Sequence, residues 1–173
     1  MANKFSRRSF LQKSATAAIG LTVVPSIVMG SKLGHVAPSD KLNIAAVGVG
    51  GMGASNLSNL KSQNIVALAD VDWSYAKGTF EAYPQAKRYY DFRKMYQEMG
   101  KSIDAVVVAT ADHTHAIIAS EAMTMGKHVY VQKPLTHTVH EARALTLAAK
   151  ESKVATQMGI QGHSGGGLRR VCE

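Results

Sequence analysis

A glycine-rich turn in the first third of the chain has the spacing of a diphosphate-binding site. Gly48-x-Gly50-x-x-Gly53 follows a short apolar stretch, residues 42–47, and leads into a segment expected to be helical. In that order of strand, turn and helix, the first glycine permits a tight turn, and the second lets the main chain approach a diphosphate at the helix N-terminus. The third lets the helix pack closely on the strand. The predicted dinucleotide-binding residues of this turn are Gly48, Gly50, Gly51, Met52 and Gly53.

Asp70 is predicted to bind the adenosine ribose of the same cofactor. It closes the second apolar stretch, residues 64–69, and lies 22 residues after Gly48. An acid in this place accepts hydrogen bonds from ribose hydroxyls. Because its carboxylate repels a 2′-phosphate, the pattern favours NAD over NADP. Asp72 competes for the role, since an acid at a strand end can also cap the helix that follows.

Apolar stretches alternate with helical patterns along the rest of the chain. The continuous apolar run 104–109 is typical of a strand that is covered on both faces of a parallel sheet. The layout therefore predicts an α/β fold of Rossmann type, a doubly wound parallel sheet. Strands are expected at 42–47, 64–69, 87–90, 104–109, 128–131 and 154–158. After the helix of the glycine turn, further helices are expected at 73–82, 91–99, 113–125 and 139–152.

Polar segments follow the last three expected strands. Residues 110–115, 132–135 and 159–164 would converge on one edge of the sheet, because the carboxyl ends of parallel strands meet there. His163, in the last of these segments, is predicted to line the substrate cleft. The histidines of the chain lack the H-E-x-x-H or cysteine-rich spacing of a zinc site, so no metal site is expected.

With these segments the chain resembles the Gfo/Idh/MocA oxidoreductases, named for glucose–fructose oxidoreductase, inositol dehydrogenase and MocA. The resemblance spans residues 41 to about 170. It rests on the glycine turn with Asp70, the sequence ATADHTH at 109–115, and QKPL at 132–135 in place of the family's usual EKPL. It implies a nucleotide-binding domain followed by an α/β domain with an open antiparallel sheet, acting on sugars, polyols or their derivatives.

The resemblance assigns roles to single residues. Lys133 matches the family's catalytic lysine, which lies beside the nicotinamide and contacts the reacting hydroxyl. Thr110, His115, Gln132 and Pro134 are placed at the cofactor, although His115 is equally interpretable as an ordinary histidine at a helix start. Gln132 stands where glutamate is more frequent, which removes a negative charge beside Lys133. A cis peptide bond before Pro134 is a further hypothesis, because such a bond fixes a sharp strand end.

Paired arginines near the N-terminus predict export through the twin-arginine machinery. Ser6-Arg7-Arg8-Ser9-Phe10-Leu11 precedes an uncharged stretch, residues 14–30. That stretch falls short of the ~20 residues of a spanning helix, and Pro25 interrupts it, so a retained anchor is the weaker interpretation. The expected location is periplasmic or extracytoplasmic. The expected divisions are a signal peptide at 1–30, extending to about 37 if cleavage is later, a linker at 31–40, the NAD-binding domain at 41–160 and the start of a second domain at 161–173.

Composition argues against other classes of protein. The formal net charge of +8 falls to +4 without residues 1–30, which carry four basic residues and no acid. The remaining basic residues are scattered and lack interleaved aromatic residues, so no nucleic-acid partner is expected. The chain has one cysteine, Cys172, so no internal disulfide can form.

The sequence thus predicts an exported NAD-dependent oxidoreductase that transfers a hydride to or from a sugar or polyol. Two alternatives remain: an NAD-dependent glycoside hydrolase that oxidises its sugar transiently, and a non-catalytic nucleotide-binding protein. A helix is expected from Leu168, close to the last residue, Glu173. We therefore expect the family's C-terminal domain to lie outside this sequence, the chain alone to bind the cofactor without turnover, and the full-length protein to be a homo-oligomer.

Overall fold

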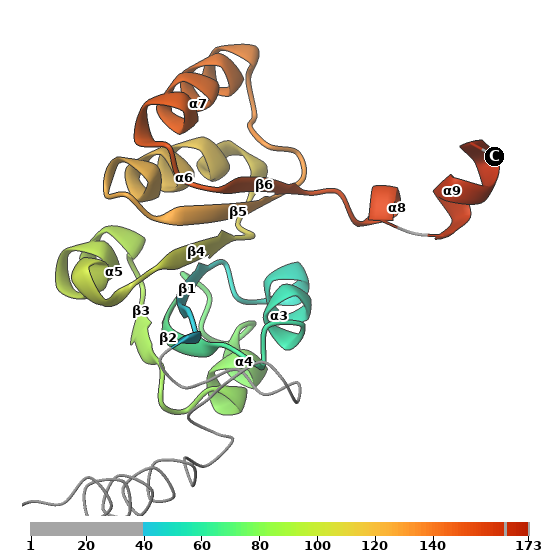
Figure 1. The fold of residues 1–173 in the computed structure, drawn as a ribbon. Helices are drawn as coiled ribbons and strands as arrows, with labels where there is room; N and C mark the ends of the chain where they lie inside the picture. Colours follow the sequence, from blue (N-terminus) through green and yellow to red (C-terminus); the bar gives the residue numbers. More distant parts are fainter. Residues whose placement is uncertain (1–39, 165, 173) are drawn as a thin grey trace, which may run out of the picture. The chain divides into compact units, whose positions relative to one another are not determined.

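The computed structural model describes residues 40–164 and 166–172 (Figure 1). The expected signal peptide and all of the expected linker except Asp40 lie outside the described residues. By its internal contacts the chain divides into Met1–Lys41 and Leu42–Glu173, and the second unit carries every described strand and α-helix.

The centre of this unit is a parallel sheet with the strand order β3-β2-β1-β4-β5-β6. The chain starts in the middle of the sheet, winds outward in one direction, and then returns to β4 to wind outward in the other. The order therefore reverses between β1 and β4, the place where ligands bind in open α/β sheets. The strands are β1 (Asn43–Val47), β2 (Asn64–Ala69), β3 (Lys87–Tyr89), β4 (Ala105–Val108), β5 (His128–Gln132) and β6 (Thr156–Gly159).

Helices cover both faces of the sheet (Figure 1). One layer holds α3 (Gly51–Ser58) and α4 (Lys77–Ala82), and the opposite layer holds α5 (Phe92–Met99), α6 (His115–Thr124) and α7 (Val139–Ser152). The short helices α8 (Gln161–Ser164) and α9 (Gly166–Cys172) follow β6, and two 3-10 turns, η2 (Gly100–Ser102) and η3 (Asp112–Thr114), lie before β4 and α6. The prediction of a doubly wound α/β fold is confirmed.

Each face of the sheet has its own apolar core. Along β1, Ala45 and Val47 belong to the core beneath α5, α6 and α7, whereas Ile44 and Ala46 belong to the core beneath α3 and α4. Side chains alternate between the faces of a strand, so a strand that is covered on both faces must be apolar at every position. This requirement explains the unbroken apolar runs of the sequence.

Several expected elements differ from the structure in type or in their bounds. Residues 73–76, expected to be helical, form turns that precede α4. The Asp72 carboxylate accepts a hydrogen bond from the Tyr75 N–H at 2.9 Å, and Trp73 stacks on Tyr90 with ring centroids 4.1 Å apart. Residues 161–164, expected to be part of a loop, form α8, and the helix expected from Leu168 begins at Gly166 as α9.

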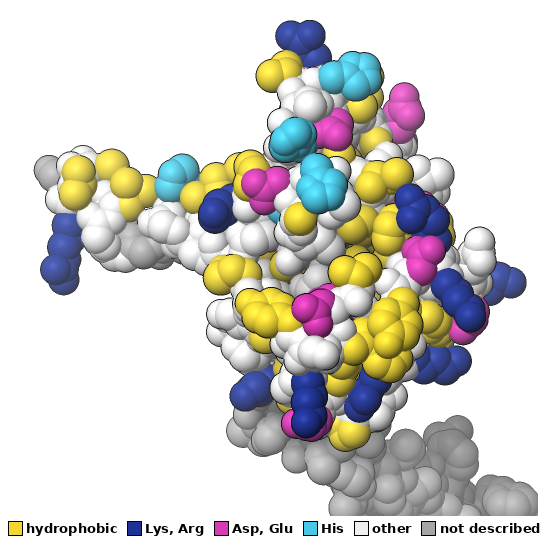
Figure 2. Space-filling model, turned by 180° about the vertical axis from the view of Figure 1, so that it is seen from behind, with side chains coloured by type: hydrophobic (Ala, Val, Ile, Leu, Met, Phe, Trp, Pro, Cys, Tyr) yellow, Lys and Arg dark blue, Asp and Glu magenta, His cyan; other side chains and the backbone are white. Residues whose placement is uncertain are grey.

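Charged side chains are mixed on the surface. On the face shown in Figure 2, Lys and Arg lie among Asp and Glu. Within residues 40–164 and 166–172, no helix is both long and apolar enough to cross a bilayer.

Candidate functional site

A cleft of about 730 Å³ opens at the carboxyl ends of β1, β2 and β4. It lies where the strand order reverses, so the fold alone makes it the expected ligand site. Four of the predicted cofactor residues line it together: Gly48, Gly50, Asp70 and Thr110.

The carboxylate of Asp70 faces the main-chain amides of the glycine turn. Its Oδ2 accepts a hydrogen bond from the Val49 N–H at 2.7 Å and a longer one from the Gly50 N–H at 3.3 Å. Its Oδ1 accepts from the Asp72 N–H at 2.9 Å. The turn therefore directs amide donors toward a negatively charged group, which is the chemistry that a cofactor diphosphate requires. Asp72 caps the turn before α4 through Tyr75, so Asp70 alone of these two acids faces the glycine turn.

The first and third glycines of the motif are required by the packing of the chain itself. Gly48 has a φ of +77°, and a Cβ on it would lie 2.6 Å from the carbonyl carbon of Ala109. A Cβ on Gly53 would overlap the carbonyl oxygen of Gly48. At these two positions α3 and the segment after β4 lie directly against the turn, with no room for a side chain. Met52, by contrast, is 48% exposed on the first turn of α3.

His115 joins the segments that follow β4 and β5. Its ring is 1% exposed, with Nδ1 2.7 Å from the carbonyl oxygen of Pro134 and Nε2 3.1 Å from that of Thr110. Both partners can only accept a hydrogen bond, whereas a neutral imidazole has a single N–H. The two bonds are therefore made together only by an imidazolium, and a neutral ring donates to one carbonyl at a time. In either state His115 is a buried connection between two segments of the site.

The QKPL segment lies at the carboxyl end of β5. The Lys133–Pro134 peptide bond is cis, as hypothesised, and the Lys133 side chain is exposed. The Lys133 N–H donates to Oε1 of Gln132 at 2.9 Å. Gln132 is only 5% exposed, and its Nε2 has no hydrogen-bond partner among the described residues. A buried amide with unused donors beside the predicted catalytic lysine is an unusual feature, because such groups are nearly always satisfied.

A capping box fixes the start of α7, five residues after the cis bond. The Thr138 hydroxyl accepts from the Glu141 N–H at 3.2 Å, and the Glu141 carboxylate accepts from the Thr138 N–H at 2.8 Å. The hydrogen bond from the Thr138 main chain, with smaller help from the Thr138 hydroxyl and from His137, holds the pKa of Glu141 below its usual range. The loop that carries Lys133 therefore has a fixed end on the side of α7.

The structure divides the predicted residues into groups. Gly51 lines a smaller pocket between α3 and α4, which it shares with Gly50. His115 lies beneath the cleft as a connecting residue. Like Gly51 and His115, the remaining predicted residues do not line the cleft: Met52, Gly53, Gln132, Lys133, Pro134 and His163. Of these, His163 is exposed on α8, after the end of β6.

The sequence does not predict several side chains of the cleft, and three of them could contact a ligand through polar or aromatic groups. Tyr75, Tyr90 and Arg93 all line the cleft. Tyr90 and Arg93 follow the carboxyl end of β3, a position that the sheet rule could have marked, and Tyr75 follows the expected ribose acid by five residues.

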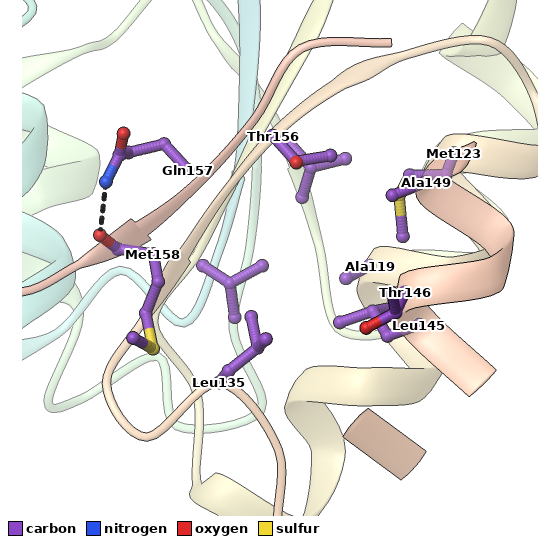
Figure 3. Close-up of a pocket in the computed structure, with 11 residues that line it drawn as sticks. Ala119, Met123, Leu135, Leu145, Thr146, Ala149, Thr156, Gln157 and Met158 are labelled. Atoms are coloured by element: carbon purple, nitrogen blue, oxygen red, sulfur yellow. Dashed lines mark hydrogen bonds between the residues drawn. The ribbon is translucent and has the colours of Figure 1, made fainter. Parts of the chain in front are cut away.

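A second cavity, of about 220 Å³, lies at the other end of the molecule between α6, α7 and the strands β5 and β6 (Figure 3). Its lining is mostly aliphatic, with Leu135, Leu145 and Met158 among the residues drawn, and Gln157 donates there to its neighbour's carbonyl oxygen. No predicted cofactor residue lines it. Its chemistry is that of a packing gap rather than of a site for a charged dinucleotide.

Among residues 40–164 and 166–172, no group of three or more His, Cys, Asp or Glu side chains is arranged to hold a metal ion.

Comparison with known proteins agrees with this geometry. Residues 42–160 match GFO_IDH_MocA, described as "Oxidoreductase family, NAD-binding Rossmann fold". The chain is 29% identical over 161 residues to Glycosyl hydrolase family 109 protein 2 of Shewanella sp. (strain ANA-3), covering 79% of this chain and 35% of that protein. It is 32% identical over 117 residues to Inositol 2-dehydrogenase of Rubrobacter xylanophilus, covering 65% of this chain and 33% of that protein.

Solved structures share the fold. Scyllo-inositol dehydrogenase from Lactobacillus casei, with bound cofactor NAD(H) and scyllo-inositol, superposes with a TM-score of 0.68 at 20% identity, over 76% of this chain and 39% of that one. The matched part of the chain thus covers 33–39% of the length of these three proteins.

Proposed function

The chain belongs to the Gfo/Idh/MocA oxidoreductase family, and from that membership we propose that the whole protein transfers a hydride between NAD and a sugar, a polyol or a derivative of one. The family's NAD-binding Rossmann domain is the part present here. One observation carries the proposal: the glycine turn with Asp70 and the QKPL segment stand at one edge of the same parallel sheet, connected through His115.

Each predicted residue would have a distinct role in binding or catalysis. The amides of Val49 and Gly50, which already face a carboxylate, would hold the diphosphate, and Asp70 would turn to accept from the adenosine ribose. Thr110, on the cleft wall, would contact the cofactor. The ammonium of Lys133 would donate to the oxygen of the reacting carbon, and His163 would contact the substrate. NAD, when bound, supplies the hydride acceptor or donor.

Lys133→Ala on the full-length protein tests this proposal. With a panel of sugars and polyols that includes inositols, and with NADH absorbance as the assay, we expect the variant to lose about 100-fold or more in turnover, the range of a lost acid–base group. NAD binding, measured by calorimetry, should be retained, and Lys150→Ala, a charge removed from the exposed face of α7, should be as active as the unmodified protein. A Lys133→Ala protein with full turnover would refute the role of Lys133.

A glycoside hydrolase activity is the second candidate, because one of the matched relatives is a glycosyl hydrolase family 109 protein. The same residues would serve, since a transient oxidation that returns its hydride also needs NAD and a lysine at the sugar oxygen. The two activities differ in net redox change. Release of free sugar from a glycoside without accumulation of NADH would favour the hydrolase.

A non-catalytic nucleotide-binding role is the third candidate. It predicts NAD binding without consumption of any glycoside, sugar or polyol, and a biological function that survives Lys133→Ala. Loss of function in that variant would exclude it.

Export belongs to the proposal as well. Its support is the pair Arg7-Arg8 followed by an uncharged stretch. Replacing both arginines by lysine should keep the protein in the cytoplasm, as measured by cell fractionation with an antibody. An unchanged distribution would refute the twin-arginine route.

Turnover is proposed to need residues beyond this chain, and the full-length protein is proposed to be a homo-oligomer. The support for the first statement is that the matched part of this chain covers only 35% and 33% of the length of the two curated relatives. The 173-residue chain should bind NAD in native mass spectrometry and show no sugar-dependent NADH formation. Steady turnover by this chain would contradict the proposal.

A further inference from the structure

The backbone conformation of Gly50 does not require glycine. Its φ of −79° and ψ of 167° are an extended conformation that alanine adopts freely. Only the space around it excludes a side chain. A Cβ on Gly50 would overlap Cδ1 and Cε1 of the Tyr75 ring, and a Cβ on Gly51 would lie 2.6 Å from the Tyr75 hydroxyl oxygen. The ring therefore rests directly on the bare main chain of the turn.

The main chain beneath Tyr75 is fixed in place. The Tyr75 N–H donates to the carboxylate of Asp72, and the next residue donates from its N–H to the Asp72 carbonyl oxygen at 3.0 Å. The hydroxyl of Thr79, one turn further on, donates to the Val49 carbonyl oxygen at 2.7 Å and binds α4 to the glycine turn. Tyr75 is consequently held at this position by the hydrogen bonds to Asp72 and by α4, which Thr79 connects to the glycine turn.

The Tyr75 side chain is nevertheless 69% exposed. It lines the large cleft together with Gly50 and Asp70, and it also lines the pocket between α3 and α4. A large aromatic side chain that lies over two glycines and is mostly exposed contributes less to folding than its size allows. Its place beside the amides of Val49 and Gly50 suits it to an anionic ligand.

We propose that Tyr75 is a cofactor-positioning residue: its ring sets the requirement for glycine at position 50, and its hydroxyl donates to the diphosphate of the bound dinucleotide. The proposal rests on the proposed use of this turn for the diphosphate. A phenol hydroxyl can donate to a phosphate oxygen without adding charge, and the ring at its base excludes water from one side of the turn.

Two substitutions of Tyr75 separate the hydroxyl from the ring. We expect Tyr75→Phe to weaken the binding of NAD and of ADP-ribose by about tenfold, the usual effect of removing one hydrogen bond to a charged group. Adenosine, which lacks the diphosphate, should bind both proteins equally. Tyr83→Phe is the matched control: it removes a neighbouring hydroxyl that bonds the Leu57 carbonyl oxygen at 2.9 Å, so it should lower the melting temperature and leave the affinity of the folded protein unchanged.

A double-mutant cycle tests the origin of the glycine requirement. Gly50→Ala should weaken NAD binding about tenfold or more with Tyr75 present, and by less than about threefold when Tyr75 is already alanine, because contacting residues couple in this way. An equal penalty in both backgrounds would show that the ligand, not Tyr75, demands the glycine, and would overturn that part of the proposal. The melting temperature of each unliganded variant identifies any that fails to fold, and Gly50→Ser, a second small substitution, then replaces it in the cycle.

The outcomes remain distinguishable from those of the proposed function. If the unmodified protein binds neither NAD nor ADP-ribose by calorimetry, the use of the turn for a dinucleotide is refuted. If it binds both and Tyr75→Phe binds them equally well, the role of the Tyr75 hydroxyl is refuted while the dinucleotide site stands.

Discussion

Asp70→Ala should destabilise the protein before any cofactor is added. The Asp70 carboxylate accepts the Val49 N–H at 2.7 Å, and Val49 is fully buried while the carboxylate is in place, so removing the carboxylate takes the charged partner from this donor. A buried donor left without a partner costs about 1–3 kcal/mol. The Gly50 bond, at 3.3 Å, is long and adds little, and the Asp72 N–H is exposed and can turn to water. We expect a total loss of about 2 kcal/mol.

Asp70→Asn is the matched control for this measurement. Its amide oxygen can still accept from the Val49 N–H, but its NH2 group cannot accept from the Asp72 N–H, so the charge and that exposed bond are lost. Because charge-assisted hydrogen bonds are roughly twice as strong as neutral ones, the expected loss is about 1 kcal/mol, half that of alanine. Urea unfolding of the 173-residue chain measures both, as a lower midpoint at unchanged slope. If Asp70→Ala came within about 0.5 kcal/mol of the unmodified chain, the bond to Val49 would not hold the turn as described.

The same pair of variants tests the selection of NAD. Both should bind NAD more weakly, and both should discriminate less against NADP, because the repulsion between a carboxylate and a 2′-phosphate is removed in each. Calorimetry with the two cofactors gives the ratio of dissociation constants. A ratio that stays the same in Asp70→Asn would refute the electrostatic account of NAD preference.

Three further predictions concern the frame of the site. His115→Ala should cost about 2–3 kcal/mol, because it removes a buried side chain and its hydrogen bonding to the main-chain carbonyls of Thr110 and Pro134, whereas His113→Ala, an exposed neighbour, should stay within about 0.5 kcal/mol in the same urea titration. The pKa of Glu141 is lowered in the folded chain, so its carboxylate should stabilise α7 at pH values above the usual carboxyl range, and this stabilisation should be lost as the pH falls through the lowered pKa. In Glu141→Gln, the free energy of unfolding should depend less on pH at acid pH. An unchanged pH dependence in this variant would contradict the capping role. Leu145→Ala, which enlarges the cavity of Figure 3, should cost about 2–5 kcal/mol by thermal or urea unfolding, whereas the same substitution at exposed Leu147 should cost much less.

The fold could be predicted from the sequence because its main signals are local. A strand covered on both faces needs an unbroken apolar run, and β4 shows one. Helix α7 begins and ends where the sequence predicts, since Thr138 and Glu141 form its capping box and the chain turns at Lys153 in a left-handed conformation. Residues 73–76 were mispredicted because a long-range contact, the stacking of Trp73 on Tyr90, acts on them together with the Asp72 cap.

The candidate site was predictable only in part. The sheet rule brings Thr110 and Gln132 to one edge from the sequence alone, because each lies at the carboxyl end of a parallel strand. It could not show that His115 would be buried between their segments, since burial depends on the packing of α6 against both. Nor could it show that the Asp70 carboxylate would bond the turn across the sheet, a contact between residues 21 positions apart in sequence.

The glycine motif can reflect either the packing of the chain or the binding of a ligand, and the structure distinguishes the two. Gly48 and Gly53 are required by the chain's own packing, because Gly48 lies against Ala109 and Gly53 against Gly48. Any protein whose first helix packs this closely on the turn after β1 would need both glycines. Their spacing alone therefore predicts a turn rather than a ligand. What points to a dinucleotide is that amides of the turn face the Asp70 carboxylate, with one carboxylate oxygen 2.7 Å from the Val49 nitrogen. A chain with the three glycines but without Asp70 would keep this fold and lose the strongest physical reason to assign it a cofactor.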